Sequence, residues 1–276
     1  MDNSATIVFL VILFALVVGA VTLIIVLSVI NAKYRRFVQN NSVSLKELSE
    51  LNKSYHFLKI KNFDMSHSYD NENFYNNISC RDYLTYQLVY EQRAVSKALK
   101  DTMLNKTAYD EYRQKVSDIM KFGNYDTDIG KLKLKKLIRF EDKLFQEESL
   151  KPQIKFSILV TLHLTNINGQ RKRRKSNRFV ASEVKEVITK LNQKRGDYYT
   201  NREIWDAICR VERGKVTNKM RFYIYSRDGY RCRRCGRKTK DLEIDHIYPI
   251  AKGGKSTMDN LQTLCHRCNV RKGDSV

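Results

Sequence analysis

The C-terminal part of the chain contains residues 232–268, which read CRRCGRKTKDLEIDHIYPIAKGGKSTMDNLQTLCHRC. This stretch begins and ends with a Cys-x-x-Cys pair, Cys232 with Cys235 and Cys265 with Cys268, and 29 residues separate the pairs. Four thiolates at this spacing are the donor set that a tetrahedral zinc ion requires. We therefore predict a structural Zn²⁺ bound by the four cysteines, which would stabilise a module with few apolar residues of its own.

A disulfide and a thioredoxin-like redox motif are the alternatives for these cysteines. A redox motif has one Cys-x-x-Cys at a strand-to-helix junction, whereas this chain has two pairs. A disulfide is disfavoured because we expect the segment to face the reducing cytoplasm. Cys80 and Cys209 lie outside the pairs, and we expect both to be buried thiols.

Between the two pairs, the pattern predicts a strand that ends at Asp245 and His246, then a Gly-Gly turn. We expect a helix to carry Asn260 and the last two cysteines, which would bring Asn260 and Asn269 to Asp245 and His246. A carboxylate and a neutral oxygen donor can hold a divalent cation while an imidazole deprotonates water. The pattern thus indicates phosphodiester cleavage. The alternative is a structural Asp-His pair beside the zinc, without catalysis.

From about Met220 to Gly273 the chain resembles the zinc-stabilised, four-cysteine type of HNH endonuclease domain. Besides the cysteine pairs, the matching motifs are Arg227-Asp228-Gly229-Tyr230, Ile244-Asp245-His246-Ile247, Gly253-Gly254, Asp259-Asn260-Leu261 and Asn269 with Lys272-Gly273. The resemblance implies a ββα-metal fold, two antiparallel strands and a helix, and metal-dependent cleavage of DNA.

The resemblance also implies the roles of individual residues. His246 would be the general base, Asp245 a ligand of a catalytic Mg²⁺ or another divalent cation, and Asn260 a residue that positions the base and its loop. Asn269 stands where the family often has its closing His, so it would be the second metal ligand of an H-N-N site. An amide oxygen can ligate Mg²⁺, although more weakly than imidazole binds softer metals. His266 is an alternative ligand, but an exposed position between zinc ligands is favoured.

The charge of the chain indicates a polyanionic partner. It has 51 Lys and Arg against 30 Asp and Glu, a formal net charge of +21, so DNA, expected to be double-stranded, or an anionic membrane is favoured. Residues 219–240 contain nine Lys or Arg and one acid. We expect Arg231, Arg233 and Arg234 to contact phosphates and Lys272 to approach the scissile phosphate.

Upstream, the hydrophobic period changes after Pro152. Alternating apolar residues from Ile154 to Leu164 predict a strand, and the turn at residues 166–169 predicts a hairpin. The second arm is strongly basic, and we expect it to contact DNA or acidic lipid headgroups, unless it is only a solvated charge run. The nucleic-acid-binding candidates in this arm are Arg171, Lys172, Arg173, Arg174 and Lys175. A helix capped by Ser182 is expected to follow, and then a further helix from Asn201 to Arg213, in which Trp205 is expected to belong to the core.

The region from Ser42 to about Leu150 has apolar residues at helical spacing, apart from a polar loop at residues 70–77. We interpret it as a small helical bundle or short coiled coil and assign no chemistry to it. It is the expected site of homo-oligomerisation or of a regulatory partner.

The N-terminal segment is uncharged from Asn3 to Ala32 and almost wholly apolar from Thr6 to Ile30. A helix of that apolar length spans about 37 Å, enough to cross a membrane. A cleaved signal peptide is disfavoured, because no basic segment precedes the run and no small-residue cleavage site follows it. Three cations directly after the run, at positions 33, 35 and 36, place the rest of the chain in the cytoplasm.

Together these patterns predict an α+β chain. Its four parts are a transmembrane anchor (1–36), a mostly helical cytoplasmic region (37–150), a basic β-hairpin with helices (151–215) and a ββα-metal HNH module with a structural zinc (216–276). The expected function is a membrane-anchored, metal-dependent DNA endonuclease, with defence against foreign DNA as the leading role. The alternative is a non-catalytic zinc module that tethers nucleic acid to the membrane.

Overall fold

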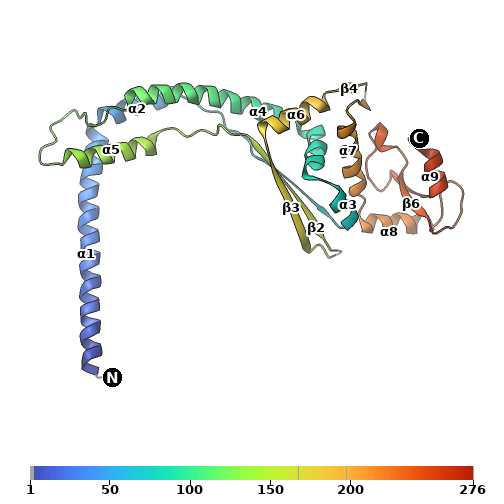
Figure 1. Ribbon diagram of the computed structural model, residues 1–276, viewed down its shortest axis with the longest axis horizontal. Helices are drawn as coiled ribbons and strands as arrows, with labels where there is room; N and C mark the ends of the chain where they lie inside the picture. The colour runs from blue at the N-terminus through green and yellow to red at the C-terminus, as the bar shows by residue number, and fades with distance from the viewer. Residues whose placement is uncertain (1–2, 167, 197, 276) are drawn as a thin grey trace. The chain divides into compact units, whose positions relative to one another are not determined.

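The computed structural model describes residues 3–166, 168–196 and 198–275 (Figure 1). By their contacts, the residues form two compact units. The first comprises Met1–Leu58 and Leu104–Ile154, and the second comprises Lys59–Met103 and Lys155–Val276. Helix α4 (Cys80–Ile119) belongs to both, since its first part lies in the second unit and its last part in the first.

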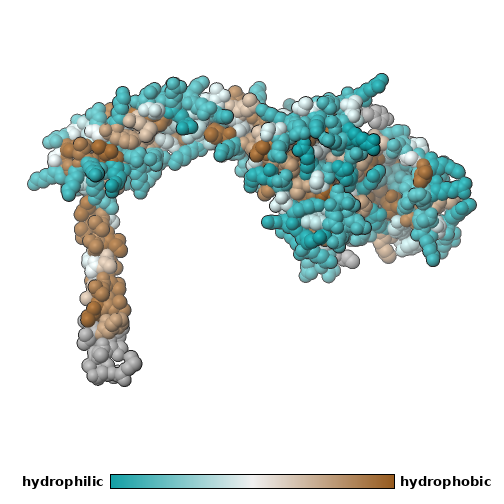
Figure 2. Space-filling model, in the orientation of Figure 1, coloured by the Kyte–Doolittle hydropathy of each residue, from teal (hydrophilic) through white to brown (hydrophobic). Residues whose placement is uncertain are grey.

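The first unit begins with the long helix α1 (Asn3–Asn41). In the described part of the chain, this is the one helix long and apolar enough to cross a membrane, and an 18-residue window of its candidate span, Ile12–Asn41, has a mean hydropathy of 3.0. Figure 2 shows its apolar length in brown, and side chains from Ile12 to Ile30 are exposed. A membrane span and a signal sequence both have these properties.

The C-terminal end of α1 packs into the core of the first unit. Tyr34 and Val38 are buried there against α2 (Val43–Ser54), the end of α4 and α5 (Leu134–Glu148). The carboxylate of Glu141 is fully buried, and it accepts hydrogen bonds from Ser42 Oγ, Gly123 N and Tyr125 Oη. These hydrogen bonds compensate for the burial of the Glu141 carboxylate. With Tyr34 and Val38 buried, the last turns of α1 are part of this packed core.

The second unit contains a three-stranded sheet in the order β1-β2-β3. Strand β1 (Phe63–Tyr69) is parallel to β2 (Ser157–Thr165), which is antiparallel to β3 (Arg171–Val180). The predicted hairpin is therefore confirmed, although Ile167 of its turn lies outside the described residues. One face of β2 is buried because its apolar residues alternate, and the core on this face includes residues of α3 (Glu72–Asn77), α4, α6 (Ala181–Leu191) and α7 (Arg202–Gly214).

The prediction for residues 42–150 was wrong in two places. Strand β1 lies within the segment expected to be helical, and α3 replaces most of the expected polar loop. Every second residue of β1 faces the core, but two of these, Met65 and His67, are only half-buried. The alternating pattern is also limited to the seven residues of this strand. The strand forms by pairing with β2, some 90 residues later in the chain, so local spacing alone does not reveal it.

The C-terminal region contains the two antiparallel strands and the helix expected from the resemblance. Strand β6 (Leu242–His246) pairs with β7 (Leu261–Cys265), and α9 (His266–Lys272) follows. Helix α8 (Asn218–Arg227) precedes them, and a 3-10 turn, η1 (Ile250–Lys252), lies between the strands. A minor two-stranded pair, β4 (Lys194–Arg195) with β5 (Tyr198–Tyr199), connects α6 to α7.

The prediction that one helix carries Asn260 and the last two cysteines was wrong. Asn260 lies in the loop before β7, and Cys265 ends that strand, while Cys268 lies in α9. The reason is the alternation of Leu261, Thr263 and Cys265, which are buried on one side of β7.

Candidate functional site

The four cysteines of the two pairs come together in the second unit. Their Sγ atoms all lie within 4.8 Å of one another, and Cys235 Sγ is 3.8 Å from Cys265 Sγ. Sulfurs of a tetrahedral site with Zn–S bonds of about 2.3 Å are separated by about 3.8 Å. Cys232, Cys235, Cys265 and Cys268 thus form a candidate zinc site, as the sequence predicts.

Among the cysteines of the described residues, these four are the ones that lie close enough together to share a metal ion. Burial opposes ionisation of Cys232, but backbone N–H groups directed at its sulfur lower the pKa of this thiol overall, which favours the thiolate that binds zinc. Cys80 and Cys209 are buried free thiols, as expected. Burial raises the pKa of Cys209 to about 11, so its thiol is neutral.

A cavity of about 390 Å³ lies beside the end of β6. Four residues singled out in the sequence line it, namely Asp245, His246, Asn269 and Lys272. Side chains from helices upstream complete the wall: Phe74, Trp205, Cys209, Arg213 and Arg221. Trp205 was expected to be a core residue, but it is half-buried and faces this cavity. Asn260 does not line the cavity.

Asp245 is fixed by two neighbours. Its Oδ2 accepts a hydrogen bond of 2.9 Å from Gln262, the residue opposite in β7, and lies 3.3 Å from Lys272 Nζ. Lys272 Nζ also donates to the backbone oxygen of His246 at 2.8 Å. The Lys272 side chain is only 9% exposed. The ammonium group therefore holds the end of β6 and neutralises the carboxylate within the cavity wall.

Asn269 is oriented by Glu243, a residue that sequence reasoning did not single out. Asn269 Nδ2 donates to Glu243 Oε2 at 2.6 Å, so the amide oxygen Oδ1 is the group available to another partner. This bond is the main reason that the pKa of Glu243 is lowered. Glu243 Oε1 lies 2.8 Å from His266 Nδ1, and the His266 side chain is 64% exposed and outside the cavity.

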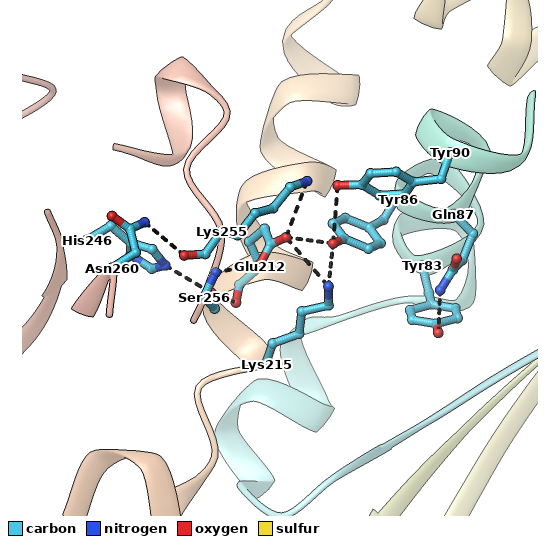
Figure 3. A network of polar contacts seen from close by, with 10 residues as sticks. All are labelled: Tyr83, Tyr86, Gln87, Tyr90, Glu212, Lys215, His246, Lys255, Ser256 and Asn260. Carbon is cyan, nitrogen blue, oxygen red and sulfur yellow. Dashed lines mark hydrogen bonds and ion pairs between the residues drawn. The ribbon is translucent and has the colours of Figure 1, made fainter. Parts of the chain in front are cut away.

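His246 ends β6 with a buried imidazole that is 8% exposed. Its Nε2 lies 2.9 Å from Ser256 Oγ, as Figure 3 shows. Burial lowers the pKa of His246, and the nearby carboxylates Asp245 and Glu212 offset this only in part. The imidazole is therefore neutral at neutral pH, the form that can accept a proton.

Asn260 closes the loop between the two strands. Its Oδ1 accepts from Tyr248 N at 2.8 Å, and its Nδ2 donates to the backbone oxygens of Tyr248 and Lys255 at 3.1 and 2.8 Å. Gly254 is required in this loop, because a Cβ there would lie 1.9 Å from the Tyr248 oxygen. Asn260 therefore holds the loop that carries Ser256 next to His246.

Arg213 and Arg221 also line the cavity, and sequence reasoning did not single them out. Within residues 3–166, 168–196 and 198–275, neither guanidinium forms an ion pair, and the buried Nε of Arg221 has no hydrogen-bond partner. The Arg221 guanidinium lies 5.2 Å from the centroid of the Phe74 ring. The sequence shows Arg221 as one of nine cations, and only the fold brings it to Phe74 and the cavity.

The three arginines predicted to contact phosphates lie elsewhere. Arg231, Arg233 and Arg234 are exposed around the first cysteine pair, and none lines the cavity. Arg233 Nη1 is 3.4 Å from Asp228 Oδ1, a weak contact on an exposed side chain. Any contact of these residues with nucleic acid would be outside the cavity.

Strand β3 divides the basic arm between its two faces. On the core face, Arg173 donates to Glu72 Oε1 at 2.6 Å and to Asn76 at 3.0 Å, and Lys175 lies over the Tyr75 ring. Arg174 and Arg178 alternate with these residues and lie on the other face of the sheet, opposite His163 and Leu159 of β2. The register shift between Leu164 and Thr165 brings Arg171 opposite Thr165, so Arg171 lies on that face as well. Lys172 sits at the register shift near the turn and is exposed.

Comparison with known proteins supports the resemblance in this region. A family model described as HNH endonuclease matches residues 232–275. The match includes the four cysteines, Asp245, His246, Asn260 and Asn269, whereas Glu212, Arg213 and Arg221 precede it. No curated protein and no solved structure matches the chain. The resemblance and the predicted fold class are thus confirmed, and the HNH match suggests nuclease activity and nucleic-acid binding.

Proposed function

We propose that this chain is a membrane-anchored, metal-dependent endonuclease that hydrolyses phosphodiester bonds of double-stranded DNA. One observation supports this most directly. The cavity at the end of β6 combines three groups of the region that matches HNH endonucleases, a neutral buried imidazole, a carboxylate and an amide oxygen, with two arginines that precede this region and form no ion pair with the described residues. The imidazole suits a base, the carboxylate and the amide oxygen suit a cation site, and the arginines suit a phosphate site.

In this mechanism His246 is the general base. Its neutral ring accepts the proton of the water that attacks the phosphorus atom. Lys272 and the two cavity arginines, Arg213 and Arg221, contact the nonbridging oxygens of the phosphate. Asn260 positions the base indirectly, through the loop that it closes.

Asp245 and Asn269 would hold the catalytic cation. A carboxylate and an amide oxygen are hard oxygen donors, and they fit Mg²⁺ or a similar divalent ion with water and phosphate as further ligands. Asn269 is favoured over His266 because it lines the cavity, whereas the imidazole of His266 is paired with Glu243 outside it. When bound there, such a cation would polarise the phosphate and stabilise the leaving oxygen.

We further propose that α1 spans the membrane and that the rest of the chain lies in the cytoplasm. The apolar side chains from Ile12 to Ile30 are exposed, and Lys33, Arg35 and Arg36 follow them directly. A nuclease fixed at the inner face of a membrane would meet incoming DNA, so we propose defence against foreign DNA as its role. The helical first unit is the proposed site of oligomerisation or regulation.

The test is cleavage of supercoiled plasmid by the purified full-length chain in detergent, with Mg²⁺ or Mn²⁺. We expect nicked and linear products that disappear with EDTA and in His246→Ala. The matched control is His56→Ala, which removes an exposed histidine of the first unit. His266→Ala retains cleavage, whereas Asn269→Ala loses it, if Asn269 completes the cation site.

The opposite result supports the alternative function. If zinc-loaded chain binds DNA with steep salt dependence but yields no cleaved plasmid under any divalent ion, the chain is a tethering module. Cleavage that survives His246→Ala would contradict the assigned base.

A further inference from the structure

A buried carboxylate stands behind the imidazole of His246. Glu212 lies in α7 and is 1% exposed. Its Oε1 accepts a hydrogen bond of 2.6 Å from Tyr86 Oη, and its Oε2 accepts one of 3.2 Å from the backbone N of Ser256 (Figure 3). Lys215 Nζ and Lys255 Nζ lie 3.5 and 3.9 Å from Oε1. The charge is thus partnered from α4, α7 and the loop of the HNH region.

The hydroxyl group of Tyr86, which donates to Glu212, is itself held by a hydrogen bond from Lys215. Lys215 Nζ donates to Tyr86 Oη, so the phenol gives its own proton to Glu212. Burial raises the pKa of Tyr86, which keeps the phenol protonated. The carboxylate therefore cannot turn away from Ser256 without breaking a short hydrogen bond to Tyr86.

The hydrogen bonds of Ser256 determine which nitrogen of His246 carries a proton. Ser256 Oγ lies 2.6 Å from the backbone oxygen of Glu212, which can only accept, so the single hydroxyl proton is used there. Toward His246 Nε2, at 2.9 Å, Ser256 Oγ must then accept. Nε2 therefore carries the ring proton, and the lone pair lies on Nδ1.

We propose that Ser256 and Glu212 are positioning residues for His246: they hold its Nε2–H and leave Nδ1 as the atom that takes the proton from water. The proposal rests on the proposed nuclease function. Ser256 lies inside the matched residues 232–275, but Glu212 and Tyr86 come from helices before them. The base of the nuclease region thus depends on the helical part of the second unit for its orientation.

The first measurement is the tautomer of His246 in the full chain with ¹⁵N-labelled histidine, where five His residues give few signals. His246→Ala identifies the signal. We expect the Nε2–H tautomer in the wild type and its loss in Ser256→Ala. A wild-type chain with the Nδ1–H tautomer would overturn the proposal. This result does not depend on cleavage, so it separates a failure of the positioning from a failure of the nuclease function.

The second measurement is plasmid cleavage by the same variants. We expect Ser256→Ala to lower kcat about 10-fold to 100-fold, a part of the 10²–10⁴ that a general base supplies, with KM within about twofold. Ser256→Thr retains the hydroxyl and should restore most of kcat. Glu212→Gln should lower kcat less than Ser256→Ala, because the backbone oxygen that fixes Ser256 remains.

The control is Glu203→Gln, an exposed carboxylate of the same helix that pairs with Lys190. Zinc content and thermal unfolding of each variant show that it is folded. Equal kcat and an unchanged tautomer in folded Ser256→Ala would refute the positioning role. If Ser256→Ala does not fold, the tautomer of His246 in the wild type and the kcat of Ser256→Thr still test the positioning role of Ser256.

Discussion

Arg221 illustrates how one side chain can indicate a ligand. Its guanidinium is half-buried in a cavity wall, stacked near Phe74, and forms no ion pair with the described residues. Burial lowers the pKa of Arg221, because the charged form loses hydration without gaining a partner. A phosphate oxygen in the cavity would supply that partner. The charge thus costs stability in the free protein and favours binding of an anion.

The first prediction concerns this residue. We expect Arg221→Ala to raise the Kd for duplex DNA about tenfold and to reduce the slope of log K against log salt by about 0.9, the value for one lost phosphate contact. The melting temperature should not fall. Arg202→Ala, an exposed arginine at the start of α7, is the control. Unchanged affinity in Arg221→Ala would refute the phosphate contact.

The second prediction concerns the cysteines. We expect Cys268→Ser to lose the single bound zinc and to unfold residues 220–275, because this segment has only small apolar clusters of its own. Cys209→Ser changes a buried thiol outside the cluster and should retain zinc. Zinc content by mass spectrometry and proteolysis of the C-terminal region measure the two effects. Full zinc content in Cys268→Ser would contradict the four-cysteine site.

Among the secondary-structure elements, β3 shows what strand geometry adds to a run of charge. The run looks uniform in the sequence, but alternate residues of a strand face opposite sides. Arg173 and Lys175 are engaged with α3, whereas Arg171, Arg174 and Arg178 lie on the other face. Of these two sets, only the latter lies on the face of the sheet away from the core.

The third prediction separates these two sets. Replacing Arg171, Arg174 and Arg178 by alanine should lower affinity for DNA and reduce the salt slope by about 2.7, or 0.9 for each contact. Arg173→Ala should change DNA affinity less than twofold and lower thermal stability, because it breaks the contacts with Glu72 and Asn76. If the triple variant instead loses binding to anionic liposomes but not to DNA, the lipid-binding alternative is favoured.

The whole molecule combines an apolar helix with two packed units, and the last turns of that helix form part of the core of the first unit. If α1 were a signal sequence, cleavage would have to occur on the N-terminal side of these turns and leave their packing intact. We expect retention, because Tyr34 and Val38 follow the apolar run by only one turn or two and are buried.

The fourth prediction tests this anchor. The full chain should remain in membranes after alkaline extraction and should retain its N-terminal sequence, whereas a chain lacking residues 1–30 should be released. In right-side-out vesicles, protease should leave the two packed units intact, as the proposed orientation requires. An N-terminus that begins after residue 20 would identify α1 as a signal sequence instead.

Sequence patterns determined the parts of this protein that depend on short-range order. The apolar run of α1, the alternation of β2, the four-cysteine spacing and the HNH motifs are each contained within a few tens of residues. These patterns require no knowledge of the fold, because periodic burial and metal ligation impose them locally. They predicted the fold class, the cysteine cluster and four residues of the cavity: Asp245, His246, Asn269 and Lys272.

The tertiary structure alone decided which distant residues complete the site. Tyr86 and Glu212 are 126 residues apart, and Glu212 and Ser256 are 44 apart, yet together they orient His246. The pairing of β1 with β2 and the contact between Phe74 and Arg221 likewise join residues that are far apart in the sequence. The physical reason is that a buried polar group can be satisfied by any donor that the fold brings near, so its partners leave no periodic pattern in the sequence.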